Sequence, residues 1–176
     1  MGIRSLFQPQ PTLTSEQVNR GLRWLTVDGA ATMGFGSITG SGILAAFALL
    51  LGANNLQIGT LAAIPFLTMP LQIVTVAVVE RFRRRKLIAV PVWLAAETVW
   101  IPIALIPVFI DVPSGEAVSL LIGFIALRGM LTAVQAAAWN SWLRDLVPQQ
   151  VLGAVFARRL RYATLAAMAF GLGAAV

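Results

Sequence analysis

Long runs of apolar residues, separated by short polar segments, dominate this sequence and limit what it can fold into. The four longest runs cover about residues 24–51, 56–79, 87–110 and 118–143. An α-helix rises about 1.5 Å per residue, so about 20 residues cross the ~30 Å hydrocarbon core of a bilayer. Each run is long enough to span a membrane as a helix. We therefore predict an all-α integral membrane protein.

The two ends of the chain differ from these four runs. A fifth apolar run covers residues 162–176, but 15 residues reach only ~22 Å as a helix. We therefore expect an incomplete fifth span, or a fragment of a longer protein. Residues 1–21 contain neither an apolar run nor a signal-peptide cleavage pattern. We predict a segment outside the membrane at 1–21, with a short amphipathic helix, and a transmembrane helical domain at 22–176.

The amino-acid composition indicates a lipid environment and excludes several kinds of catalytic and metal-binding site. Hydrophobic residues make up 58% of the chain and charged residues only 11%, whereas soluble domains carry roughly 25% charged residues. The chain has no cysteine and no histidine, so disulfides, thiolate catalysis and Cys/His metal sites are excluded. It also has no phosphate-binding Walker loop. We expect neither a cofactor nor a metal, and no enzymatic activity.

The basic residues outside the apolar runs lie on one side of the predicted membrane. The polar loops at 52–55 and 111–117 contain no lysine or arginine. The other polar segments hold twelve: Arg4, Arg20, Arg23, Arg81, Arg83, Arg84, Arg85, Lys86, Arg144, Arg158, Arg159 and Arg161. Because basic loops stay in the cytoplasm, we predict a cytoplasmic N-terminus. The net charge of +6 is then a membrane-orientation signal, and we expect no nucleic-acid partner.

Two opposite charges are predicted to lie near the middle of the bilayer. Glu97 is ten residues past the start of the third run, and Arg128 is ten residues past the start of the fourth. Charges at this depth cost free energy and usually have a function. One interpretation is a structural ion pair. A second is a proton or anion site, in which Arg128 holds a substrate charge and Glu97 titrates. A third is that they face different neighbours.

Two further polar residues lie within the apolar runs. Asp28 is about one turn into the first run, where a carboxylate is favoured by the helix dipole. It either anchors the helix at the interface or lines a cavity. Gln135 follows Arg128 by seven residues and therefore shares its helix face. It either lines the same cavity or forms a hydrogen bond between helices.

Small residues recur every four positions in the first run, at Thr32, Gly36 and Gly40. Such a stripe lets another helix approach closely. We predict a packing surface here, and the alternative is a flexible helix that lines a pore.

The loop after the second run has the pattern of an acid, a base and a closing pair of bases, at Glu80, Arg81, Arg84 and Arg85. It resembles the G-x-x-x-D-R-x-G-R-R signature of the major facilitator superfamily of transporters. Val76 and Arg83 stand at the positions of the signature's two glycines, so the close helix contact and gating role that the signature implies need not apply here.

The segment after the fourth run resembles the same family. It reads W-L-R-D-L-V-P over residues 142–148, with Asp145 as its acid, and continues with Gly153, Phe156 and Arg159. This is similar to the pattern S-W-x-x-D-L-V-P…G-x-x-F-x-x-R of bacterial members. The resemblance implies about five of the six helices of the family's N-terminal half, with the first and fourth lining a central cavity. Arg128 stands where many proton-coupled members carry an arginine.

This resemblance implies a secondary active transporter of a small solute in the bacterial cytoplasmic (inner) membrane. Its expected partners are the lipid bilayer, an unidentified small-molecule substrate, and a surface that completes the cavity. That surface would come from a missing C-terminal half, a second copy or other membrane subunits. The alternative is a non-transporting subunit with a structural or assembly role in a larger membrane complex.

Overall fold

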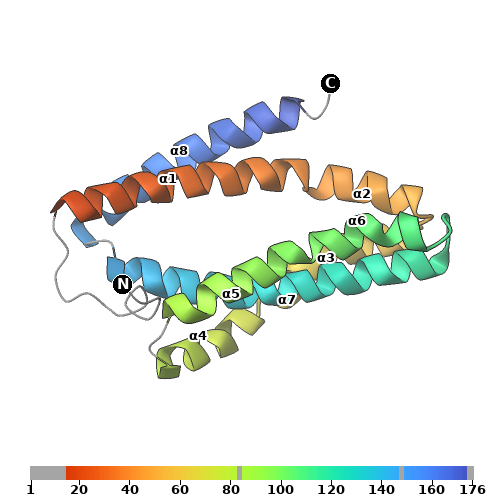
Figure 1. Ribbon diagram of the computed structural model, residues 1–176, viewed down its shortest axis with the longest axis horizontal. Helices are drawn as coiled ribbons and strands as arrows, with labels where there is room; N and C mark the ends of the chain where they lie inside the picture. Colours follow the sequence, from red (N-terminus) through yellow and green to blue (C-terminus); the bar gives the residue numbers. More distant parts are fainter. Residues whose placement is uncertain (1–14, 83–84, 147–148, 174–176) are drawn as a thin grey trace. The chain divides into compact units, whose positions relative to one another are not determined.

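The described part of the chain is helical. The computed structural model describes the backbone of residues 15–82, 85–146 and 149–173, and these residues contain helices and short connections but no strand (Figure 1). The helices are α1 (Ser15–Ile38), α2 (Ser41–Leu50), α3 (Asn55–Thr68), α4 (Leu71–Phe82), α5 (Arg85–Thr98), α6 (Trp100–Phe109), α7 (Gly115–Leu146) and α8 (Gln149–Gly173). The predicted all-α class is confirmed for this part of the chain.

Four helical stretches within the described residues are long and apolar enough to cross a membrane. They are Arg23–Leu50, Asn55–Ala77, Ile88–Phe109 and Gly115–Asn140. Large apolar side chains such as Leu56, Phe66 and Phe109 are mostly exposed on them. An exposed apolar surface of this extent is stable in lipid and unfavourable in water. The four predicted long runs therefore correspond to four membrane-spanning helical stretches, and the protein is membrane-embedded.

The first three of these stretches are interrupted. α1 and α2 are separated at Gly40, α3 and α4 at Pro70, and α5 and α6 at Val99. A proline has no N–H to donate to the carbonyl four residues earlier, so Pro70 and Pro102 each remove one helical hydrogen bond near an interruption. The first predicted run, at residues 24–51, is therefore covered by two helices, α1 and α2.

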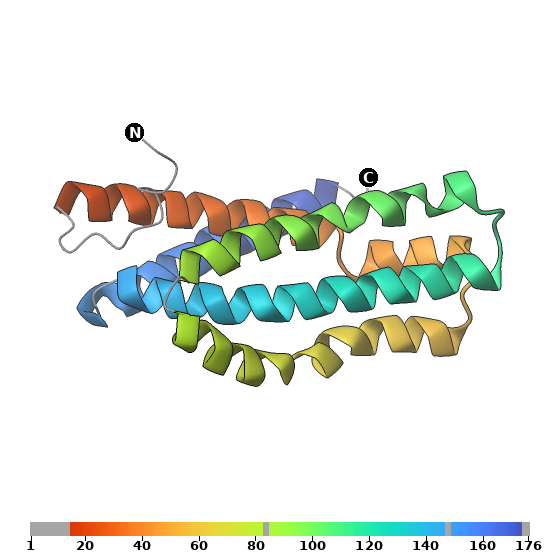
Figure 2. The same ribbon diagram turned by 60° about the horizontal axis from the view of Figure 1, so that its bottom comes forward.

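The chain forms two compact units. The terminal unit comprises residues 1–44 and 144–176, and the central unit comprises residues 45–143. In the terminal unit, α1 and α8 lie side by side and run in the same direction (Figures 1 and 2). Close approaches of Gly29 to Arg159 and of Gly34 to Phe170 define this packing.

The C-terminal helix differs from the prediction. α8 is one helix from Gln149 to Gly173, whereas the sequence predicts a separate, incomplete span over 162–176. Three arginines, at 158, 159 and 161, interrupt its apolar character, and its described residues are not among the four candidate spans.

In the central unit, the loops before α3 and α7 meet at one end. The Ser114 N–H donates to the Leu51 carbonyl at 3.0 Å. Gly52 has φ +96° and lies against Pro113, whose Cβ is 2.8 Å from where a Gly52 Cβ would be. The neighbouring Asn54 caps α3. The loops predicted to share one side of the membrane therefore contact each other.

Small side chains bring the helices of the central unit close to α7. Ala89 of α5 and Ala138 of α7 are buried together, and α5 and α6 lie along α7 in both views (Figures 1 and 2). A Cβ on Gly129 of α7 would be 3.1 Å from atoms of both Ile64 and Thr68 in α3. Small residues allow this close packing in a membrane, where helix association depends on van der Waals contact.

Candidate functional site

The two charges predicted at mid-membrane depth form an ion pair. Glu97 lies in the last turn of α5 and Arg128 lies within α7. The Arg128 Nη2 donates to Glu97 Oε1 at 3.2 Å and to Oε2 at 3.5 Å. The predicted pairing of these two residues is therefore observed, and the interpretation that they face different neighbours is wrong.

An aromatic ring completes this cluster. The Arg128 Cζ lies 4.8 Å from the centroid of the Trp100 ring, within the range of a cation–π interaction. Trp100 is the first residue of α6, immediately after Val99, whose backbone dihedrals are helical (φ −60°, ψ −22°). Trp100 was not among the residues predicted from the sequence. Its position three residues after Glu97 was the available signal, because residues at this spacing share a helix face.

The cluster is partly buried, and not all of its hydrogen-bond donors are used. The Arg128 side chain is 25% exposed and that of Glu97 is 30% exposed. The Arg128 Nε is buried and has no hydrogen-bond partner among the described residues. A guanidinium has five N–H donors in a planar fork that suits carboxylate and phosphate oxygens. In the described contacts, Glu97 takes only Nη2 of this fork.

Gln135 is half-buried on α7, two turns and about 10.5 Å along the axis from Arg128. Its side chain forms no hydrogen bond with a residue that the structure describes, so the predicted interhelical bond is not seen there. The structure places Gln135 on the same helix as Arg128 but does not bring it into the ion-pair cluster. Its predicted role as a cavity-lining residue stays a prediction.

Asp28 forms a second ion pair, with Arg159. Arg159 Nη2 donates to Asp28 Oδ2 at 3.3 Å, and the two side chains are 26% and 45% exposed, respectively. The contact depends on Gly29, because a Cβ at that position would be 2.6 Å from Arg159 Cγ. The sequence pattern placed Arg159 in the basic segment after the fourth run and in the family resemblance there, but did not predict this partner.

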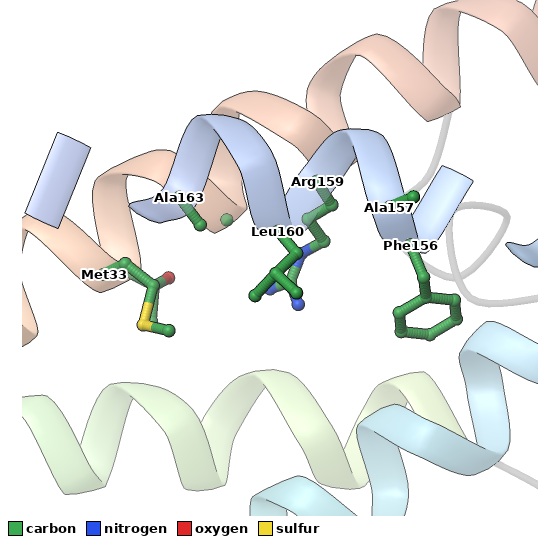
Figure 3. A pocket seen from close by; sticks show the side chains of 8 residues that line it. Met33, Phe156, Ala157, Arg159, Leu160 and Ala163 are labelled. Atoms are coloured by element: carbon green, nitrogen blue, oxygen red, sulfur yellow. The ribbon is translucent and has the colours of Figure 1, made fainter. Parts of the chain in front are cut away.

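A groove lies beside this second ion pair, between α1 and α8. Its volume is about 370 Å³. Thr32 and Met33 of α1 and Phe156, Arg159 and Leu160 of α8 contribute to its lining. Figure 3 shows the side chains of Met33, Phe156 and Leu160 on the same side of the helix pair as the Arg159 guanidinium. The groove is apolar apart from this guanidinium and the Thr32 hydroxyl.

Among the described residues, the glycines of the predicted small-residue stripe make no close contact with α8. A Cβ on Gly36 would have no atom within 4 Å, and one on Gly40 would meet only the backbone of the preceding turn. The close contacts with α8 involve Gly29 and Gly34 instead. Which glycines of α1 make close contacts depends on where α8 packs, and the spacing in the sequence does not give this.

The predicted cytoplasmic loop motif falls largely outside the described residues. Arg84 lies in an undescribed segment, and the side chains of Glu80, Arg81, Arg85 and Asp145 are also outside the description. The motif therefore stays a prediction. Among the described residues, no group of three or more Asp, Glu, His or Cys side chains is placed to hold a metal ion.

Known proteins add no assignment to this arrangement. No protein-family model, no curated protein and no solved structure matches the chain.

Proposed function

We propose that this chain is an N-terminal part of a secondary active transporter of a small solute, of the major facilitator type. In this proposal it supplies the first five helical spans of that fold, in a bacterial cytoplasmic membrane with the N-terminus in the cytoplasm. The observation that carries the proposal is the Glu97–Arg128 ion pair inside two membrane-spanning stretches, with Trp100 against the guanidinium.

Charged side chains within a membrane are unfavourable unless a partner or a function compensates for their cost. An arginine at the centre of a spanning helix costs roughly 2.5–3.5 kcal/mol on insertion scales. A pair of charges at one depth reduces that cost, but an apolar pair would avoid it. Arg128 has hydrogen-bond donors that Glu97 does not occupy, so an anionic solute can share the guanidinium with Glu97. Glu97 is then the group that exchanges a proton as the solute binds or leaves.

Solute binding tests the proposal before transport is attempted. The protein is placed in lipid nanodiscs, and its tryptophan fluorescence is followed while small carboxylates, phosphates, amines and sugars are added. We expect a saturable change with at least one anionic class, because Trp100 contacts Arg128. The change should be lost in Arg128→Gln and kept in Arg161→Gln, which alters an exposed arginine elsewhere.

Transport is then measured in sealed vesicles that contain the chain and any protein with which it purifies. Uptake of the bound solute, driven by a proton gradient and lost in Glu97→Gln, is the expected result. A folded wild-type chain that responds to no solute class would overturn the proposal. That outcome would favour a structural or assembly subunit of a larger membrane complex.

A further inference from the structure

The groove between α1 and α8 has the chemistry of a lipid site. Met33, Phe156 and Leu160 form apolar walls, and Arg159 supplies one cationic group (Figure 3). We propose that this groove binds an anionic phospholipid from the surrounding bilayer, with an acyl chain against the apolar walls and the phosphate at Arg159. The proposal goes beyond transport and does not depend on it.

Gly29 determines where the cationic group lies. Since a Cβ there would be 2.6 Å from Arg159 Cγ and 2.7 Å from Nε, the arginine stem lies directly against the α1 backbone. The guanidinium is therefore held at the wall of the groove instead of extending from α8. Asp28 accepts a hydrogen bond from one terminal nitrogen, Nη2, at 3.3 Å. A phosphate can approach the guanidinium beside that carboxylate.

The charge of the terminal unit favours an anion. Its described side chains include five arginines and one acid, Asp28. Arg158 and Arg161 flank the groove arginine in α8 and are exposed. Basic groups at the membrane surface attract anionic headgroups, and basic pockets between membrane helices bind them. The local charge therefore favours an anionic headgroup over a zwitterionic one.

The form of the groove favours a lipid over a water-soluble anion. The volume of the groove, about 370 Å³, is at the lower end of the ~300–1,000 Å³ typical of ligand pockets. This space suits part of an acyl chain, and the rest of the lipid would stay in the bilayer. Part of α1 belongs to the membrane-spanning stretch Arg23–Leu50, so lipid is its immediate solvent. An apolar groove with one charged group in its lining matches an amphipathic molecule.

Native mass spectrometry of the full chain can count retained lipids. The protein is taken from membranes containing equal amounts of phosphatidylglycerol and phosphatidylcholine. We expect one phosphatidylglycerol per chain, retained about fivefold or more over phosphatidylcholine, as the attraction of a single arginine predicts. Arg159→Gln should remove this preference. Ala157→Leu, which fills the groove from an exposed position, should lower retention without changing the charge.

Matched variants control for folding and for nonspecific attraction. Arg23→Gln removes an exposed arginine outside the groove lining, and Ala169→Leu enlarges an exposed α8 alanine outside it. Both should retain the lipid. Asp28→Asn should increase retention, because the carboxylate no longer competes for Arg159. Equal retention of the two lipids would refute the proposal. Retention that neither Arg159→Gln nor Ala157→Leu changes would also refute the proposal. That result is expected if another helix fills the groove.

Discussion

Arg128 and Glu97 are 31 residues apart in the sequence, yet their side chains meet between α7 and α5, with Nη2 3.2 Å from Oε1. The Trp100 ring lies against the same guanidinium. In the terminal unit, Asp28 and Arg159 similarly join α1 to α8. In each unit, an ion pair thus connects two helices that are distant in sequence, and each arginine has a buried Nε without a hydrogen-bond partner among the described residues.

Neutralising one member of the Glu97–Arg128 pair should destabilise the protein more than neutralising both. Glu97→Gln or Arg128→Gln leaves a partly buried group without its partner, at a cost of about 1–3 kcal/mol. The double substitution removes both charges, so we expect a coupling free energy of about 0.5–3 kcal/mol. The free energy of unfolding of all four proteins, measured in mixed detergent micelles, checks this. Additive losses would show that the contact contributes nothing to stability.

The ion pairs show what the sequence could predict and what it could not. The depths of Glu97 and Arg128 follow from helix rise and run boundaries, so their pairing was predictable from the sequence. The contact of Asp28 with Arg159 spans 131 residues and depends on how α1 packs against α8. Arg159 also belongs to a basic segment, and membrane orientation alone explains the charge of that segment. Its sequence context therefore gave no sign of an ion pair with Asp28. Trp100 was missed because aromatic residues are common in apolar runs.

Alanine substitutions along α1 should separate packing glycines from free ones. In Gly29→Ala, the new methyl would lie 2.6 Å from Arg159 Cγ, and we expect a loss of about 1–3 kcal/mol from overpacking. Gly36→Ala is the matched control two turns later, with no atom within 4 Å of the new Cβ. It should stabilise the helix by about 0.5–1 kcal/mol. Thermal unfolding in detergent measures both, and equal effects would contradict the observed α1–α8 contact.

The predicted orientation can be tested with single cysteines, since the chain has none of its own. Asp111 is exposed in the loop before α7, and Gly153 is exposed on α8. With the basic segments in the cytoplasm, Asp111→Cys should react with a membrane-impermeant maleimide added outside cells. Gly153→Cys should react only after the membrane is permeabilised. The opposite pattern of labelling would reverse the assigned orientation.

An added carboxylate should replace the Glu97 side chain if Arg128 can bind an anionic solute. Glu97→Ala removes the carboxylate and leaves space beside Arg128, whose side chain is 25% exposed in the wild type. Acetate or propionate should then raise the unfolding temperature of this variant, by an amount that grows with concentration. A ligand that binds only the folded state contributes about 2.7 kcal/mol at 100 times its Kd.

The comparison of variants makes this rescue specific. Wild-type protein already has Glu97 beside Arg128, so it should gain less from acetate than Glu97→Ala does. The double variant Glu97→Ala/Arg128→Gln has no cation at the site and should gain nothing beyond the effect of chloride at equal ionic strength. Rescue confined to Glu97→Ala would show that Arg128 accepts an external carboxylate, as binding of an anionic solute requires. If acetate affects all three proteins equally, Arg128 is only a structural partner of Glu97, and the main support for a transport site is lost.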